Sequence, residues 1–149
     1  MATTKKFHLR VRAVIHDGEN LLVARMKGTN YCFLPGGHHE VGEMLVDALV
    51  REIKEEIGLS AKVKQYLGVI ENGWPEGNVY NYEINHVFEV LVKNISAKTA
   101  ISSQENHLEF LWIKIDDFKK QNLLPVMIRP LILNWLRGEK KIWQESSFR

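Results

Sequence analysis

The chain has 149 residues, of which 45% are hydrophobic and 26% are charged. This composition is ordinary for a soluble globular protein and excludes the disordered and membrane-spanning classes. The formal net charge of +2 arises from interspersed basic and acidic residues, so the sequence predicts no broad basic surface for nucleic acid. The length is typical of one domain, and we expect residues 1–149 to form a single one.

The cysteine count and the N-terminal sequence bear on the compartment. Cys32 is the only cysteine and cannot form a disulfide within the chain. Residues 1–9 lack the apolar segment of a secretion signal, and no apolar run approaches membrane-spanning length. We therefore expect a reduced, cytoplasmic protein with no membrane partner. Cys32 itself lies in a short apolar run, which favours a buried and unreactive thiol.

The first half of the chain predicts strands followed by a helix. Residues 9–25 are expected to form a hairpin, because apolar and polar side chains alternate before a turn and an apolar run then resumes. Residues 31–34 form a strand-like run, and Pro35-Gly36-Gly37 predicts an irregular loop after it. From Met44 the apolar residues recur at helical spacing, and Gly58 is placed to end that helix.

The second half predicts mainly strands. Residues 62–70 and 80–92 are expected to pair, separated by the turn formers of residues 72–78. A strand, a short helix and a C-terminal helix that Pro130 either starts late or kinks follow over residues 107–113, 116–121 and 126–136. The charged residues 137–141 are expected to form a solvated tail, with a weak anion contact as the alternative.

Three glutamates of the predicted helix carry the first functional signal. Glu52, Glu55 and Glu56 stand at positions i, i+3 and i+4, so their carboxylates point into one arc of the helix surface. Like charges at i and i+4 destabilise an isolated helix by roughly 0.2–0.5 kcal/mol per pair, and a divalent cation removes this penalty. Mg²⁺ prefers oxygen ligands and often binds substrate phosphates as well. The cluster indicates a phosphate-handling site, although a bare Glu-x-x-Glu-Glu is more often a solvated acidic face.

The glutamates belong to a longer pattern over residues 37–59. It reads G-x5-E-x7-R-E-U-x-E-E-x-G-U, where U is a bulky aliphatic residue, and a chance match has odds of roughly one in a billion per starting position. The fixed residues are Gly37, Glu43, Arg51, Glu52, Glu55, Glu56 and Gly58. The chain therefore resembles the Nudix hydrolase family. This resemblance implies an α/β fold, an α/β/α sandwich with a mixed β-sheet between helices.

The resemblance also implies a chemistry. Nudix hydrolases use metal ions to cleave a phosphoanhydride bond by attack of water on phosphorus. The implied ligands of Mg²⁺, or of Mn²⁺, are the three helix glutamates and a backbone carbonyl of the glycine loop, namely Glu52, Glu55, Glu56 and Gly37. Glu52 is also a candidate to orient or deprotonate the water. Glu43 and Arg51 are expected to form a structural ion pair, with direct phosphate contact by Arg51 as the alternative.

A fourth catalytic glutamate is expected outside the pattern of residues 37–59, which we call the box. Family members often use such a glutamate from a loop late in the domain. Glu105 lies in a polar loop before the strand of residues 107–113, free to swing toward substrate. Glu109 falls on the strand itself, where its neighbours occupy the opposite face. We predict that Glu105 ligates a metal or activates water, the alternative being an ordinary solvated carboxylate.

Three side chains are weaker candidates for substrate contact. Arg12 and Arg25 lie on or beside the first hairpin, where family members often contact substrate, but edge-strand arginines that only face water are equally common. Trp74 is a candidate to stack on a base, although a partly covered loop tryptophan is the simpler interpretation. His38 and His39 are interpreted as solvent-facing loop histidines, because Mg²⁺ prefers oxygen.

The expected substrate is a small nucleotide, a nucleoside diphosphate linked to another moiety. Pro75 lies sixteen positions after Leu59, which resembles the proline of ADP-ribose pyrophosphatases, but it is also an ordinary turn residue. The alternatives are nucleoside triphosphates, dinucleoside polyphosphates and, in another class, a non-catalytic nucleotide-binding regulatory module. Such modules commonly lose box carboxylates, which this chain retains. A homodimer is a further expectation, with the apolar residues 131–135 as a candidate interface.

Overall fold

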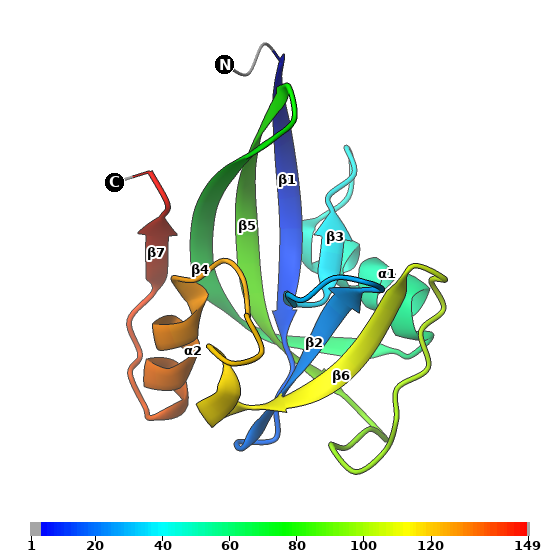
Figure 1. Ribbon diagram of the computed structural model, residues 1–149. Coiled ribbons are helices and arrows are strands. Elements are labelled where there is room, and N and C mark those ends of the chain that lie inside the picture. Colours follow the sequence, from blue (N-terminus) through cyan, green and yellow to red (C-terminus); the bar gives the residue numbers. More distant parts are fainter. Residues whose placement is uncertain (1–3, 149) are drawn as a thin grey trace.

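The computed structural model describes residues 4–148 and places strands between two α-helices (Figure 1). In chain order the elements are β1 (Thr4–Val14), β2 (Asn20–Met26), β3 (Gly36–His38), α1 (Leu45–Ile57), β4 (Ala61–Glu76), β5 (Val79–Val92), β6 (Leu108–Lys114), the 3₁₀ helix η1 (Ile115–Asp117), α2 (Ile128–Leu136) and β7 (Trp143–Ser146). No helix among these is long and apolar enough to cross a bilayer.

The larger sheet is mixed, with the strand order β3-β1-β5-β4-β7. Strand β1 runs parallel to β5, with Thr4 opposite Val79 and Val14 opposite Glu89. Strands β4 and β5 form a long antiparallel hairpin, and β7 adds in parallel to β4. Strands β2 and β6 form a separate antiparallel pair. The predicted α/β class with a mixed sheet is confirmed.

Alternating side chains of the strands divide the core between two faces. Leu22 and Ala24 of β2 belong to the apolar cluster under α1, whereas Leu21 and Val23 belong to the cluster under α2. This division follows from the two-residue period of a strand, which sends successive side chains to opposite faces. Burial of each large aliphatic side chain contributes roughly 1.5–3 kcal/mol. The helices therefore cover opposite faces of the strands (Figure 1).

Helix α1 confirms the predicted helix and its end. Leu49, Ile53 and Ile57 recur at helical spacing and are buried against the strands. Gly58 follows the last turn with a φ of 74°, a left-handed conformation that glycine adopts without steric cost. The buried stripe fixes the rotation of the helix about its axis, and this rotation decides where the box glutamates point.

Two of the predicted hairpins differ from the structure. Strands β1 and β2 lie in different sheets, because β1 pairs along its length with β5. His16, which lies between the two strands, forms an isolated bridge with Leu21 of β2. Strand β4 continues through Trp74 to Glu76, so the loop shrinks to a two-residue turn after Glu76. Pairing with β5 overrides the turn propensity of residues 72–76. Trp74 is therefore a strand residue, not a loop residue.

The glycine loop also differs from its prediction, since Gly36–His38 is the short strand β3. Gly36 has a φ of 139°, and a Cβ there would overlap the carbonyl oxygen of Val11. Only glycine permits this approach between the two backbones. Residues 31–34 make isolated bridges and no regular strand.

The C-terminal elements agree more closely with prediction. Strand β6 confirms the strand of residues 107–113, and η1 is shorter than the predicted helix. Helix α2 starts late, at Ile128, with Pro130 in its first turn, where a missing N–H breaks no helical hydrogen bond. Cys32 is buried, and burial raises the pKa of its thiol to about 11. Strand β7 was not predicted.

Candidate active site

A cleft of about 850 Å³ lies on the α2 side of the sheet. Its polar wall consists of side chains from β1, β4 and β5, including Arg10, Arg12 and Glu83. Its apolar wall includes Tyr31, Phe33, Leu34 and residues 124–128. Gly36, Gly37 and Glu56 line it as well, so the cleft brings the glycine loop and the last turns of α1 to the strands.

Glu56 is the most unusual carboxylate of the cleft. Its Oε1 accepts a hydrogen bond from the Gly36 N–H at 2.9 Å, while its Oε2 is buried and has no hydrogen-bond partner within the described residues. Burial raises the pKa of Glu56 to about 8, against the opposing effect of the Arg12 charge. A buried acceptor without a partner is costly. A nearby cation would therefore stabilise the ionised form of Glu56.

Glu52 lies against the glycine loop. A Cβ at Gly37 would overlap the Glu52 carboxylate, so only glycine leaves room for this side chain. The Oε1 of Glu52 accepts a hydrogen bond from Nη1 of Arg51 at 3.0 Å. Burial raises the pKa of Glu52 as well. The box thus places two partly desolvated carboxylates beside the loop backbone.

Arg51 joins the loop to the helix. Its Nη2 and Nε donate to the two oxygens of Glu43 at 2.7 and 3.1 Å, and Nη2 also donates to the His38 carbonyl at 3.1 Å. This bidentate pairing lowers the pKa of Glu43 to about 2. The contacts are those expected of a structural ion pair. Nη1 further contacts Glu55, whose side chain is half exposed, at 3.3 Å.

The residues present fit a hard divalent cation. Within residues 4–148, no three His, Cys, Asp or Glu side chains already form a ligand group. Arg51 lies between Glu52 and Glu55, contacting both, and Glu56 turns toward Gly36. The unpartnered oxygen of Glu56 nevertheless supplies the kind of buried anionic acceptor that Mg²⁺ or Mn²⁺ binds.

The loop before β6 contacts the end of α1. The Gln104 N–H donates to the Glu56 carbonyl at 2.7 Å, and the charge of Glu105 raises the pKa of Glu56. Glu109 instead lies on β6, where an oxygen is 3.8 Å from Arg25. The structure thus places Glu105 near the box carboxylates and Glu109 on the strand.

The three candidate substrate contacts fall in different places. Arg12 lines the cleft, donates to the Leu34 carbonyl at 3.0 Å and lies 5.4 Å from the centre of the Phe33 ring. Trp74 lines the cleft from β4. Arg25 is not among the cleft-lining residues and contacts Gln121 at 3.3 Å.

The two loop histidines differ in their surroundings. His38 is exposed, although its Nε2 lies 2.9 Å from Nδ1 of His8. His39 is half-buried and its Nε2 contacts the Glu43 carbonyl at 2.6 Å, so its prediction as a solvent-facing residue is wrong. The contact with the Glu43 backbone partly shields the His39 imidazole from solvent.

Among the polar residues that line the cleft, the sequence prediction missed Arg10, Asn72, Glu83 and Asn85. For Arg10, Glu83 and Asn85 the signal is alternation, because polar residues occupy every second position of residues 8–13 and 80–85 and the other positions are aliphatic or aromatic. Buried polar side chains on one strand face are unusual, since that face normally packs in the core. Such a pattern indicates a lined cavity, but it requires knowing which strands pair.

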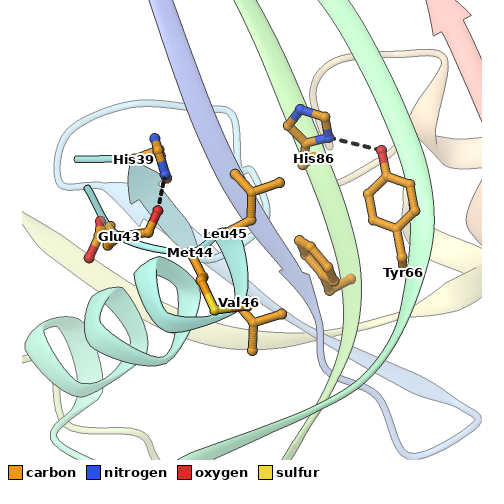
Figure 2. Close-up of a pocket in the computed structure, with 8 residues that line it drawn as sticks. His39, Glu43, Met44, Leu45, Val46, Tyr66 and His86 are labelled. Atoms are coloured by element: carbon orange, nitrogen blue, oxygen red, sulfur yellow. Dashed lines mark hydrogen bonds between the residues drawn. The ribbon is translucent and has the colours of Figure 1, made fainter. Parts of the chain in front are cut away.

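A second hollow of about 650 Å³ lies on the other face of the sheet, beside the start of α1 (Figure 2). Its surface is mainly apolar, with contributions from Met44, Val46 and Phe88. The Tyr66 hydroxyl lies 2.8 Å from Nδ1 of His86, and the Glu43 carboxylate is already paired with Arg51. The hollow therefore lacks free charged groups for phosphate chemistry.

Comparisons with known proteins agree with this geometry. The family model of the NUDIX domain matches residues 6–133. An ADP-ribose pyrophosphatase of Methanocaldococcus jannaschii is 41% identical over 81 residues, a match that spans 52% of this chain and about half, 47%, of that relative.

Solved structures share the fold. A NUDIX hydrolase from Nitrosomonas europaea superposes with a TM-score of 0.69 at 21% identity, covering 92% of this chain and 93% of that one. An ADP-ribose pyrophosphatase from Streptococcus suis gives a TM-score of 0.65 at 18% identity, covering 93% of this chain and 97% of that one. At these identities the likeness concerns the fold alone.

Proposed function

The chain belongs to the Nudix family, and from that premise we propose that it is a metal-dependent pyrophosphohydrolase. Its substrate is a nucleoside diphosphate linked to another moiety. The observation that supports this most is the buried Oε2 of Glu56, which has no hydrogen-bond partner among residues 4–148 and belongs to a residue that lines the cleft with Gly36 and Gly37. Such a costly buried group is accounted for by a bound cation.

The proposed roles of the residues come from the family resemblance, and their positions around the cleft support them. Glu52, Glu55, Glu56 and the carbonyl of Gly37 would hold Mg²⁺ or Mn²⁺, which when bound neutralises phosphate oxygens and lowers the pKa of a water. Glu52 orients or deprotonates the attacking water, and Glu105 assists from the neighbouring loop. Arg51 and Glu43 hold the glycine loop against α1. Arg12 neutralises the phosphate that is not attacked.

The substrate class is proposed as ADP-ribose-like. The M. jannaschii relative at 41% identity is an ADP-ribose pyrophosphatase, and this supports the assignment over half of the chain. The cleft of about 850 Å³ falls within the usual range of small-molecule sites. Its apolar wall suits a base and its polar wall suits phosphates and sugars. Hydrolysis of ADP-ribose would yield AMP and ribose 5-phosphate.

A substrate screen tests this function. Purified full-length protein with Mg²⁺ is assayed against ADP-ribose, nucleotide sugars, nucleoside triphosphates and diadenosine polyphosphates, and the substrates are ranked by kcat/KM. We expect ADP-ribose or a nucleotide sugar to rank first, with two phosphorylated products. A preference for triphosphates would overturn the substrate class. Binding of nucleotides without hydrolysis of any would indicate a regulatory module and overturn the enzyme assignment.

A further inference from the structure

Polar side chains of β1 and β5 form a ladder of three pairs, and the two pairs that contain Arg10 and Arg12 line the cleft. Each pair joins residues 73 positions apart in the sequence, and successive pairs lie about 7 Å apart because they are two strand residues apart. The β5 members are all at least nine-tenths buried. The pairs are His8–Asn81 at 2.9 Å, Arg10–Glu83 at 2.7 Å and Arg12–Asn85 at 3.4 Å.

The pairs of the ladder differ in how close they lie to the box carboxylates. The charges of Glu52, Glu56 and Glu83 all raise the pKa of Arg12 against the larger lowering effect of its burial. Arg12 lies opposite Gly36 in the pairing of β1 with β3, and the Gly36 N–H donates to Glu56. The Arg12–Asn85 pair is therefore the one nearest the box, and Arg10–Glu83 is the next pair along β1. A phosphate next to the attacked phosphorus would meet Arg12, and the group attached to that phosphate would meet the next pair, Arg10–Glu83.

Glu83 has the chemistry to bind hydroxyl groups. It lines the cleft and is 5% exposed. Its Oε2 accepts from Arg10 at 2.7 Å, and its Oε1 has only a long contact of 3.4 Å with Nδ2 of Asn72. A carboxylate has about four acceptor positions, so acceptor capacity remains. Arg10 and Asn72 supply donors at the same place, and a sugar hydroxyl both donates and accepts.

We propose that Glu83, with Arg10 and Asn72, binds a vicinal diol of a sugar attached to the diphosphate and thereby sets substrate specificity. This inference rests on the proposed function and adds a specificity-determining group to it. The order of groups in the substrate matches the order of the ladder, since a sugar directly follows the phosphate. The diol belongs either to the ribose of the nucleoside or to the sugar on the other side of the diphosphate.

Three substrates distinguish these sources. The kcat/KM of the Mg²⁺-loaded protein is measured for ADP-ribose, for its 2′-deoxyadenosine analogue and for its analogue with 2-deoxyribose as the terminal sugar. We expect the kcat/KM of one analogue to be about 10- to 100-fold lower than that of ADP-ribose, since a hydrogen bond to a charged group contributes about 1.5–3 kcal/mol. The analogue with the lower kcat/KM identifies which sugar Glu83 contacts. If both analogues are hydrolysed within twofold of ADP-ribose, the proposal is overturned while the hydrolase assignment stands.

Matched variants assign the effect to Glu83. In Glu83→Gln the shape is kept and the charged acceptor is lost, so the discrimination against the sensitive analogue should fall at least fivefold. Asn72→Ala provides a second test should Glu83→Gln not fold. The control is Glu89→Gln, because Glu89 pairs with His16 at the same sequence separation but lies outside the cleft. Unchanged discrimination in both Glu83→Gln and Asn72→Ala would contradict the proposal.

A binding measurement separates this inference from the catalytic one. The three compounds are titrated into EDTA-treated protein by calorimetry, where no turnover occurs. The same analogue should bind at least tenfold more weakly than ADP-ribose, even if the protein proves to be no hydrolase. Equal affinities for all three compounds, or no binding of any, would overturn diol recognition.

Discussion

Two buried carboxylates line one cleft and differ in how their charge is balanced. Glu56 is 4% exposed and Glu83 is 5% exposed, so burial does not distinguish them. Glu83 has a guanidinium partner 2.7 Å away. One oxygen of Glu56, in contrast, has no hydrogen-bond partner in the described part of the chain, and burial raises the pKa of Glu56 to about 8. A buried charge without a partner is costly, and a paired one much less so. Glu56 is therefore suited to bind a cation and Glu83 to orient a neutral group.

The largest expected effect is that of metal removal. Excess EDTA should abolish turnover and added Mg²⁺ or Mn²⁺ should restore it, because the box carboxylates are proposed to hold the ion. Glu56→Gln keeps the side-chain shape but removes the charge, so kcat should fall by at least about 10²-fold. Asp47→Asn, an exposed position on the same helix, is the control and should retain activity. Undiminished hydrolysis in EDTA would contradict the mechanism.

The next effect separates Glu105 from Glu109. Help from a general base is typically worth about 10² to 10⁴ in rate, so Glu105→Gln should lower kcat by that order. Glu109→Gln should have little effect, because Glu109 lies on β6 beside Arg25. Steady-state kinetics on the best substrate measures both. Equal and small effects would show that the fourth carboxylate lies elsewhere.

The box could be predicted from sequence because its parts are local. Gly37 to Gly58 span one loop and one helix, so spacing alone places Glu52, Glu55 and Glu56 on neighbouring helix positions. The helix end at Gly58 followed from the same local rules. Spacing could not predict that Glu56 is buried while Glu55 is half exposed. This difference depends on which strands α1 covers.

The polar wall could not be predicted for the same reason. Its pairs join residues 73 positions apart. The parallel pairing of β1 with β5 is a long-range contact, whereas the local pattern predicted a hairpin within residues 9–25. Residues 72–76 have turn-forming sequences, yet β5 extends them as a strand and brings Trp74 into the cleft. Tertiary pairing overrode local propensity in both places.

A smaller effect is expected from the supporting ion pair. Arg51→Lys keeps the charge but loses the planar fork that contacts both oxygens of Glu43 and the His38 carbonyl. The glycine loop should then be held less firmly, and kcat should fall on the order of 10-fold, as for residues that orient metal ligands. Circular dichroism should show an intact fold. A KM change without a kcat change would instead indicate direct phosphate contact by Arg51.

The smallest effect is a pH dependence of stability in the metal-free protein. The folded pKa of Glu56, about 8, exceeds its ordinary value of 4.5, so folding favours the protonated form. The contribution of Glu56 to the free energy of unfolding should therefore decrease as pH rises from about 4.5 to 8 and then level off. The Tm difference between wild type and Glu56→Gln, measured in EDTA, should shrink or reverse over this range. A difference that is constant with pH would contradict the raised pKa.

The central claim is that Glu56, and not Glu83, carries the cation site. Titration of Mn²⁺ into the full-length protein, followed by calorimetry or electron paramagnetic resonance, tests it without requiring turnover. Saturable binding to wild type is expected, with affinity at least about 10-fold weaker in Glu56→Gln and unchanged in Glu83→Gln. Equal Mn²⁺ affinity in wild type and Glu56→Gln, or a loss of binding only in Glu83→Gln, would contradict the account.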